Sequence, residues 1–175
     1  MTFLVILGLV LLFCLIFMAT EFFNIVFLGA APFVMTKKKI IELLSREVKL
    51  GKGQRVYEVG AGLAKFLQAV EKSYPDTELI GIEYSWPVYC LSKMLLKSKH
   101  SRIKLIRKNL FKVNLGDADL IYCYLTPGMM YKLGEKFTAE CRPGTKIISY
   151  AFSIPNMEIK RTIKEKGDTI YFYEI

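Results

Sequence analysis

A strand that runs into a glycine turn and then into a helix is the feature that most restricts how this chain can fold. Residues 56–64 read Val-Tyr-Glu-Val-Gly-Ala-Gly-Leu-Ala, so a short apolar run ends at Gly60 and Gly62. Glycine lets the backbone turn tightly and approach a ligand closely. The N–H groups at the start of the following helix point at the same place. The segment therefore predicts a buried strand whose carboxyl end borders a binding site.

The rest of the chain alternates between strand-like and helix-like segments, which is typical of a parallel sheet covered by helices on both faces. Strands are expected over residues 55–59, 78–83, 103–107, 120–124 and 146–152, and helices over 36–49, 63–73, 86–99 and 129–141. Two further strand-like segments, 157–163 and 169–174, are close enough to form an antiparallel hairpin. The pattern predicts an α/β fold with a doubly wound, mostly parallel sheet that ends in this hairpin.

The first thirty residues predict a transmembrane helix. No residue from 3 to 19 is charged, and apolar residues continue to Leu28 past Glu21 and Asn24. At ~1.5 Å per residue, such a helix crosses most of a hydrocarbon core about 30 Å thick. A cleaved secretory signal is one alternative, although no positively charged residue precedes the apolar run, and a buried core helix is another. The chain is therefore divided into an anchor, residues 1–30, and a domain, residues 31–175.

The distribution of charge predicts how the domain is oriented. The net charge is +9, no Lys or Arg precedes the apolar run, and six follow it within residues 37–52. By the positive-inside rule, the domain faces the cytoplasm, or the mitochondrial matrix in a eukaryote. Positive charge beside a membrane favours anionic lipid, although it can also attract nucleic acid or an acidic protein. Because the basic residues show no aromatic-basic repeat, we expect membrane lipid as the partner and do not expect nucleic acid.

Neither a metal site nor a disulfide framework is expected. The four cysteines form no Cys-x-x-Cys pair, and Cys14 lies inside the apolar run, so the usual spacing of zinc ligands is missing. His100 is the only histidine, which argues against a multi-histidine metal site and against a serine–histidine triad.

Two carboxylates near the glycine turn indicate the ligand. Glu58 lies two residues before Gly60, and Glu83 ends the second strand, where a carboxylate can accept hydrogen bonds from both hydroxyls of a ribose. A dinucleotide fingerprint requires a small residue where Lys65 stands, and Glu58 would repel a pyrophosphate. It would not repel the amino group and sulfonium of S-adenosyl-L-methionine. The alternative is that the glycines form a plain strand–helix turn and that Glu83 is a surface strand end.

The motifs of the chain resemble those of the class I, seven-stranded methyltransferases. The similar motifs are Glu-x-Gly-x-Gly at 58–62 and Gly-Ile-Glu-Tyr at 81–84. The stretches Pro-Phe-Val-x-Thr at 32–36, Asn-Leu-Phe at 109–111 and Tyr-Leu-Thr-Pro-Gly-Met-Met at 124–130 resemble a membrane-anchored family within that class. It contains the lysine methyltransferases of the ATP synthase c subunit and the adenine nucleotide translocase, with prokaryotic relatives. The resemblance covers roughly residues 31–152 and implies a Rossmann-like sheet with S-adenosyl-L-methionine as cofactor.

The resemblance also implies roles for the matching residues. The glycine turn would hold the methionine part of the cofactor, the end of the second strand its ribose, and the stretch after the third strand its adenine, under a lid at 32–36. The implied cofactor-binding residues are Phe33, Val34, Thr36, Glu58, Gly60, Ala61, Gly62, Glu83, Tyr84, Asn109 and Leu110. Tyr124, Thr126 and Pro127 would form the catalytic rim where the substrate amine enters. One departure is that residues 63–65 read Leu-Ala-Lys where the family usually has Asp-Gly-Arg.

The function implied by this resemblance is methyl transfer to a lysine amine of a membrane protein. A hydroxyl group of Tyr122, Tyr124 or Thr126 can accept a hydrogen bond from the amine and orient its lone pair. One alternative is a methyltransferase of a lipid or another small membrane-associated molecule. Another is a non-catalytic, membrane-tethered docking domain. The sequence makes no prediction of the oligomeric state.

Overall fold

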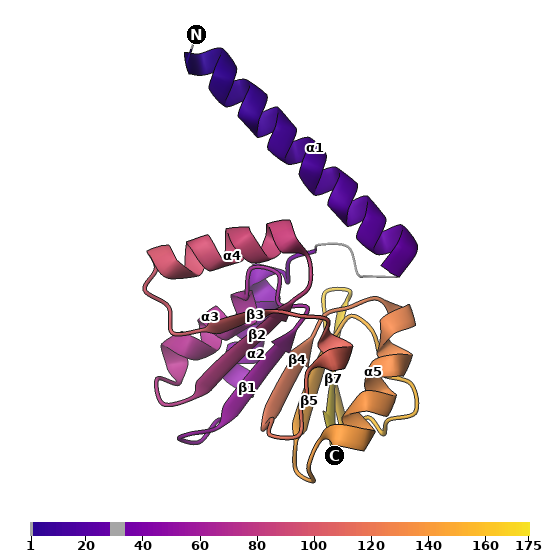
Figure 1. Cartoon of the computed structure of the whole chain (residues 1–175). Coiled ribbons are helices and arrows are strands. Elements are labelled where there is room, and N and C mark those ends of the chain that lie inside the picture. The colour runs from indigo at the N-terminus through magenta and orange to yellow at the C-terminus, as the bar shows by residue number, and fades with distance from the viewer. Residues whose placement is uncertain (1, 29–33) are drawn as a thin grey trace.

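One seven-stranded sheet forms the centre of the structure, a computed structural model that describes residues 2–28 and 34–175 (Figure 1). Its strands are β1 Arg55–Val59, β2 Glu78–Glu83, β3 Lys104–Arg107, β4 Leu120–Cys123, β5 Lys146–Tyr150, β6 Arg161–Glu165 and β7 Asp168–Glu174. They lie in the order β3-β2-β1-β4-β5-β7-β6. The first five strands are parallel, whereas β7 is antiparallel to both β5 and β6. The predicted mostly parallel sheet with a C-terminal antiparallel hairpin is confirmed.

Helices cover both faces of this sheet. The helices α2 (Lys38–Glu47), α3 (Lys65–Ser73) and α4 (Trp86–Ser98) pack on one face, and α5 (Pro127–Glu140) with the short 3-10 helix η1 (Leu110–Lys112) packs on the other. In β4, Leu120 and Tyr122 pack with the first group, whereas Ile121 and Cys123 pack with the second. Successive side chains of a strand point to opposite faces, so a strand buried on both sides reads as a continuous apolar run.

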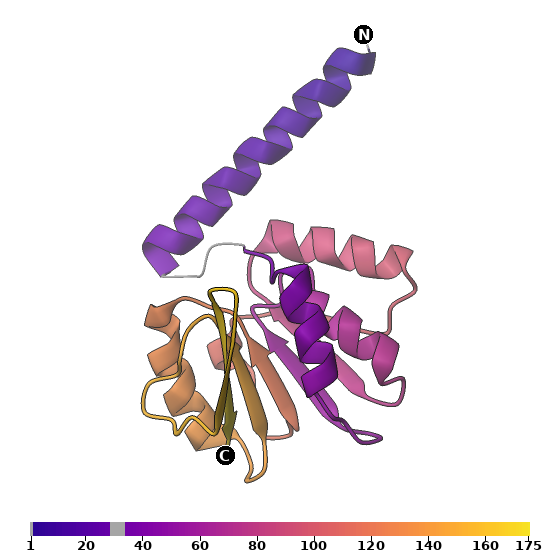
Figure 2. The ribbon, with the colours of Figure 1, turned by 180° about the vertical axis from the view of Figure 1, so that it is seen from behind.

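The N-terminal helix α1 (Thr2–Leu28) stands clear of the domain (Figures 1 and 2). Its large apolar side chains between Phe3 and Phe13 are exposed rather than packed against protein. Among the described residues it is the one helix that is long and apolar enough to cross a membrane, as judged by length and composition. The predicted boundary between anchor and domain, at residues 30 and 31, lies outside the described residues.

Helix α2 begins at Lys38, two residues later than the sequence pattern predicts. Thr36, the first residue of the predicted range, lies outside the helix, and its side chain forms a hydrogen bond with the hydroxyl of Tyr122 at 2.8 Å. Lys37 takes the N-cap position without a side-chain cap. Residues 34–37 are therefore drawn across the end of the sheet and do not extend the helix.

Helix α3 and strand β5 are shorter than predicted because residues at their ends have positive φ angles. The φ angles of Gly62 and Ala64 are +53° and +52°, which is a left-handed conformation that a right-handed helix cannot include. The helix consequently begins at Lys65 instead of residue 63. Strand β5 ends at Tyr150 rather than at residue 152 because Ala151 has a φ angle of +71°.

The first strand of the hairpin begins and ends later in the chain than its predicted range, residues 157–163. The strand found there is β6, Arg161–Glu165. The φ angles of Lys166 and Gly167 are +47° and +85°, and positive values at both central residues are typical of a two-residue type I′ turn. This turn pairs Glu165 with Asp168, so the strand extends back from residue 165 and residues 157–160 stay irregular.

Candidate active site

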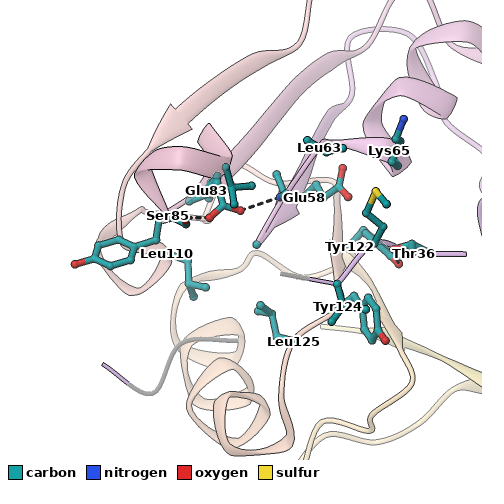
Figure 3. A pocket seen from close by; sticks show the side chains of 18 of the residues that line it. Thr36, Glu58, Leu63, Lys65, Glu83, Ser85, Leu110, Tyr122, Tyr124 and Leu125 are labelled. Atoms are coloured by element: carbon teal, nitrogen blue, oxygen red, sulfur yellow. Dashed lines mark hydrogen bonds between the residues drawn. The ribbon is translucent and has the colours of Figure 1, made fainter. Parts of the chain in front are cut away.

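A pocket opens at the carboxyl ends of the central strands (Figure 3). The order of the strands reverses between β1 and β4, and ligands of open α/β sheets bind at such a reversal. Most of the wall comes from the ends of β1, β2 and β4 and from the loops that follow them. The lining residues are Val34, Met35, Thr36, Glu58, Gly60, Ala61, Gly62, Leu63, Lys65, Ile82, Glu83, Tyr84, Ser85, Val88, Lys108, Leu110, Tyr122, Tyr124, Leu125 and Met129.

The glycine turn forms one wall of this pocket. The backbone N–H groups of Gly60 and Ala61 both donate to the carbonyl oxygen of Ile82, each at 2.9 Å, and so tie the turn to β2. Gly60 has a φ angle of +72°, which is strained for any residue with a side chain. A Cβ atom at this position would lie 2.6 Å from Cδ2 of Leu125. Both the conformation and the close packing therefore favour glycine here.

The Glu83 carboxylate joins the glycine turn to the loop that follows β2. Its Oε2 atom accepts a hydrogen bond from the Gly62 N–H at 2.8 Å, and its Oε1 atom accepts one from the Ser85 N–H at 2.7 Å (Figure 3). These bonds hold the half-buried side chain at the pocket wall. An ionised carboxylate can accept about four hydrogen bonds, so Glu83 can hold the loops and bind ligand hydroxyls at the same time.

Glu58 is buried near the end of β1 and has a structural role that the sequence does not reveal. Its Oε2 atom accepts a hydrogen bond from the Leu67 N–H at 3.1 Å, and the Phe66 N–H also bonds to the carboxyl group. Ala64, at the N-cap position of α3, has no side-chain oxygen for these donors and makes no side-chain cap. Glu58 therefore satisfies from β1 the N–H groups that a capping side chain would otherwise bind.

Burial raises the pKa of the Glu58 carboxyl group from 4.5 to about 8, because a carboxylate loses hydration in the protein interior. The N–H groups of Leu67 and Phe66 lower this pKa, whereas the negative charge of Glu83 raises it. Burial is the largest of these effects, since the residue is only 4% exposed. At neutral pH the carboxyl group is therefore largely protonated, and a cationic ligand group beside it would favour ionisation.

Because of Glu58, the free energy of unfolding is expected to fall as the pH rises from about 5 to about 8. Between the ordinary pKa of 4.5 and the folded pKa of about 8, the folded protein keeps a proton that the unfolded chain releases. Each unit of difference corresponds to ~1.4 kcal/mol, so the total loss is on the order of a few kcal/mol. Urea denaturation of the ligand-free chain across this pH range should show the loss.

The variant Glu58→Gln should flatten this pH dependence, because the amide keeps an oxygen for the cap and does not titrate. A matched control is Glu135→Gln, at an exposed position of α5, which should keep the wild-type dependence. An unchanged pH dependence in Glu58→Gln would contradict the assignment of the titration to this residue.

The segment of residues 34–37, here called the covering segment, lies along one side of the pocket. Its Val34, Met35 and Thr36 line the wall, and the hydrogen bond between Thr36 and Tyr122 joins it to β4. Tyr122 is buried, and its ring stacks on that of Phe66 with 4.4 Å between the centroids. The covering segment is therefore bonded to a rigid part of the core.

A cluster of charges at Asp168 holds the other end of the covering segment. The Oδ1 atom of Asp168 accepts hydrogen bonds from Lys37 Nζ at 2.8 Å and from the Tyr150 hydroxyl at 2.7 Å. Its Oδ2 atom forms an ion pair with Lys39 Nζ at 2.7 Å. These donors hold the pKa of Asp168 well below its ordinary range. The ring of Tyr150 lies 4.5 Å from that of Tyr124, between centroids, so the cluster also contacts the rim of the pocket.

Replacement of Asp168 by asparagine is expected to loosen the covering segment and to weaken binding of the predicted cofactor several-fold. The variant loses both ion pairs, so hydrogen exchange of the amides in the first turn of α2 should become faster. Glu165→Gln, on the same hairpin, is the control and should change neither quantity. Wild-type exchange rates in Asp168→Asn would show that the cluster does not hold the segment.

The chain matches a known family over most of the residues that form this site. The sequence model described as the ANTKMT methyltransferase domain matches residues 58–161. The chain belongs to this family. It is a methyltransferase with S-adenosyl-L-methionine as its cofactor, and the family resemblance noted in the sequence is confirmed.

Relatives of this methyltransferase are named for lysine methylation. The protein-lysine N-methyltransferase of Saccharolobus islandicus is 25% identical over 150 residues, which are 82% of this chain and 93% of that protein. The lysine N-methyltransferase of the ATP synthase c subunit from Rattus norvegicus is 24% identical over 147 residues, 82% of this chain and 66% of that protein. The adenine nucleotide translocase lysine N-methyltransferase of Mus musculus is 29% identical over 69 residues, 39% of this chain and 30% of that protein.

Solved structures agree with the methyltransferase fold. An RNA methyltransferase from Salinibacter ruber in complex with S-adenosyl-L-homocysteine superposes with a TM-score of 0.76 at 21% identity, over 81% of this chain and 94% of that one. The precorrin-6y C5,15-methyltransferase of Geobacter metallireducens superposes with a TM-score of 0.66 at 12% identity, over 81% and 89% of the two chains. These two proteins are named for different acceptors, so the likeness shows the fold and leaves the acceptor open.

Most of the predicted site residues of the methyltransferase lie together in the pocket. Asn109 instead accepts a hydrogen bond from the Phe111 N–H at 3.0 Å and caps η1, beside the pocket. Thr126 is the N-cap residue of α5 and Pro127 is its first residue, and both lie between two lining residues. Phe33 lies outside the described residues. The predicted residues that line the pocket are Val34, Thr36, Glu58, Gly60, Ala61, Gly62, Glu83, Tyr84, Leu110 and Tyr124.

Several lining residues of the methyltransferase were not predicted. Lys65 stands where the family usually has arginine, so the motif contained a signal for it. Ser85 is the N-cap residue of α4 and Val88 lies in its first turn. The expected helix at 86–99, directly after the acidic strand end, was the signal for both residues. Lys108 lies next to the predicted Asn109 and had no signal of its own, whereas Met129 belongs to the stretch 124–130 that the sequence had already marked.

Proposed function

We propose that this methyltransferase transfers a methyl group from S-adenosyl-L-methionine to a lysine amine of a membrane protein. The covering segment is the observation that carries the proposal, because the chain that leaves the apolar helix α1 reaches the pocket wall at Val34. An acceptor in the membrane would therefore lie near the pocket. The names of the three relatives, each of which specifies lysine, support this acceptor.

The residues of the pocket fit the cofactor, whose methyl group is already activated on a sulfonium. The chain has only to bind it, orient it and exclude water. In our proposal, Glu83 accepts hydrogen bonds from the ribose hydroxyls, and Glu58 lies beside the amino group, which would lower the pKa of its carboxyl group. Lys65 is placed for the carboxylate. Leu110 and Val88 supply apolar surface for the adenine.

The rim formed by Tyr124, Thr126 and Pro127 is the proposed entrance for the lysine side chain. A lysine amine must lose its proton before it can act as a nucleophile, and an apolar environment lowers its pKa. Met129 on the pocket wall contributes to such an environment. A hydroxyl group of Tyr122 or Tyr124 can accept a hydrogen bond from the neutral amine and orient its lone pair. The aromatic faces also favour a neighbouring sulfonium charge.

Helix α1 is the proposed single-pass anchor, and residues 31–175 are the proposed catalytic domain. The helix shows exposed apolar side chains over the part whose side chains are described. The six basic residues that follow it within residues 37–52 favour a domain on the cytoplasmic side, or on the matrix side in a mitochondrion.

Methyl transfer is tested with the full chain in native membranes and cofactor labelled on the methyl group. We expect the label in methyl-lysine after hydrolysis of membrane proteins, and no label when Glu83→Ala replaces the wild-type chain. Label recovered only from extracted lipid would replace this proposal by that of a lipid methyltransferase. Cofactor binding without any transfer would indicate a non-catalytic docking domain.

A further inference from the structure

Helix α4 exposes an apolar stripe on the face that points away from the sheet. Trp86 is 54% exposed and Met94 is 62% exposed, and Cys90, midway between them, is exposed as well. Residues four positions apart lie on one side of a helix, so these three side chains form a continuous row. Leu91, beside the row, is 37% exposed. A helix that faced only water would have polar residues at these positions.

Basic residues lie beside this row. Lys93 and Lys97 are exposed on the same side of α4, and the ammonium group of Lys93 lies 5.4 Å from the ring centroid of Tyr89. In contrast, Val88, Ser92 and Leu96 are buried on the opposite side of the helix. A row of tryptophan and other apolar side chains flanked by lysines is typical of helices that lie in the plane of a membrane interface.

The position of α4 brings this side of the domain close to the anchor. In both views α4 runs along the end of the domain at which the chain arrives from α1 (Figures 1 and 2). Six residue steps separate Leu28, the last residue of α1, from Val34 on the pocket wall. At about 3.3–3.6 Å per residue, these steps can span only roughly 20 Å. If α1 crosses a bilayer, the pocket and α4 must therefore stay near its surface.

We infer that the face of α4 formed by Trp86, Cys90, Leu91, Met94, Lys93 and Lys97, here called the α4 face, docks onto an anionic lipid surface. The inference rests on the proposed membrane anchor and adds a second contact between the domain and the bilayer. The apolar row enters the interface, and the two lysines bind anionic headgroups. Val34 and Met35, at 56% and 53% exposed, border the same end of the pocket, so docking turns the pocket mouth toward lipid.

The occupant is lipid for two reasons. The domain is strongly basic, since the chain has a net charge of +9, and this charge is complementary to anionic headgroups. The short connection to α1 also keeps the α4 face near the bilayer. The bilayer surrounds the anchor on all sides, so lipid is within reach of this face however the domain is rotated. A second copy of the chain or a substrate protein would be a different occupant, and the test below separates these outcomes.

Trp86 supplies the probe, because it is the only tryptophan in the chain. The full chain is reconstituted into vesicles of phosphatidylcholine with and without phosphatidylglycerol, and the emission of Trp86 is compared with that in detergent. With the anionic lipid, we expect a blue shift, quenching by brominated acyl chains, and a loss of about half of the quenching by iodide. The neutral vesicles should show a smaller effect.

Variants on α4 test the contact while the anchor is left intact. The double variant Lys93→Glu and Met94→Glu should restore iodide quenching of Trp86, although the chain still floats with the vesicles through α1. A matched control is Tyr131→Glu with Lys132→Glu, an exposed apolar–basic pair on α5. This pair should leave the Trp86 signals as in the wild type. Neither variant touches the cofactor pocket.

Flotation separates failure of the inference from failure of the proposed anchor. A chain that floats while Trp86 is as accessible to iodide as in detergent would overturn docking of the α4 face and leave the anchor in place. A chain that does not float would overturn both. Shielding of Trp86 that appears only in a dimer, or only after a substrate protein is added, would also overturn the lipid assignment.

Discussion

Replacement of Glu83 by alanine is expected to weaken S-adenosyl-L-methionine binding by about 100-fold or more. A hydrogen bond to a charged group contributes ~1.5–3 kcal/mol, and the variant loses two such bonds to the ribose in our proposal. It also loses the bonds that hold Gly62 and Ser85 at the pocket wall. Since ~1.4 kcal/mol corresponds to a factor of ten, isothermal titration calorimetry should resolve the effect easily.

Glu78→Ala is the matched control for this variant. Glu78 lies at the other end of the same strand, is mostly exposed, and forms an ion pair with Arg55 at 2.7 Å. Its loss should leave cofactor affinity unchanged. Glu83→Gln, which keeps one oxygen for the glycine turn, should show an intermediate loss. Equal affinities of the Glu78 and Glu83 alanine variants would contradict the role given to Glu83.

Replacement of Gly60 by valine is expected to abolish measurable cofactor binding. The φ angle of +72° costs a residue with a β-branched side chain about 1–3 kcal/mol. The new side chain must also displace Leu125, whose Cδ2 atom lies 2.6 Å from the position that a Cβ atom at residue 60 would take. To relieve the clash with Leu125 and the strained φ angle, the backbone at residue 60 must move, and this backbone forms the pocket wall.

Gly53→Val separates backbone strain from the loss of the site. Gly53 has a similar φ angle of +75°, nothing lies within 4 Å of an added Cβ atom there, and the residue is remote from the pocket lining. Both variants should therefore lower the free energy of unfolding in urea. Only Gly60→Val should lose cofactor binding. Wild-type cofactor affinity in Gly60→Val would refute the proposal that the turn at residue 60 forms a wall of the cofactor site.

The sheet was predictable because its strands are short, apolar and separated by clear turn signals. The β1, β2 and β4 segments begin where the sequence pattern places them, since a strand buried on both faces has no polar positions to obscure it. The edge strand β6, in contrast, lies later in the chain than its predicted range. It is largely exposed, so apolar patterning did not mark it, and the type I′ turn at Lys166 and Gly167 decided its register.

The glycine turn and the acidic strand end were predictable because their chemistry depends on residues close in sequence. The contacts of Asp168 were not, because this residue meets Lys37 and Lys39 across more than a hundred positions of the chain. The cap that Glu58 provides for α3 was missed for a related reason. Local patterns identify a capping residue beside the helix, and here the acceptor belongs to the preceding strand.

The position of the methyl donor is tested most directly by a crystal structure of the domain with S-adenosyl-L-homocysteine. We predict that both ribose hydroxyls lie within hydrogen-bond distance of the Glu83 carboxylate, and that the amino group lies next to Glu58. The adenine should contact Leu110. Binding of the nucleoside at another edge of the sheet, with the space between Gly60 and Glu83 filled by protein side chains, would contradict the account of this site.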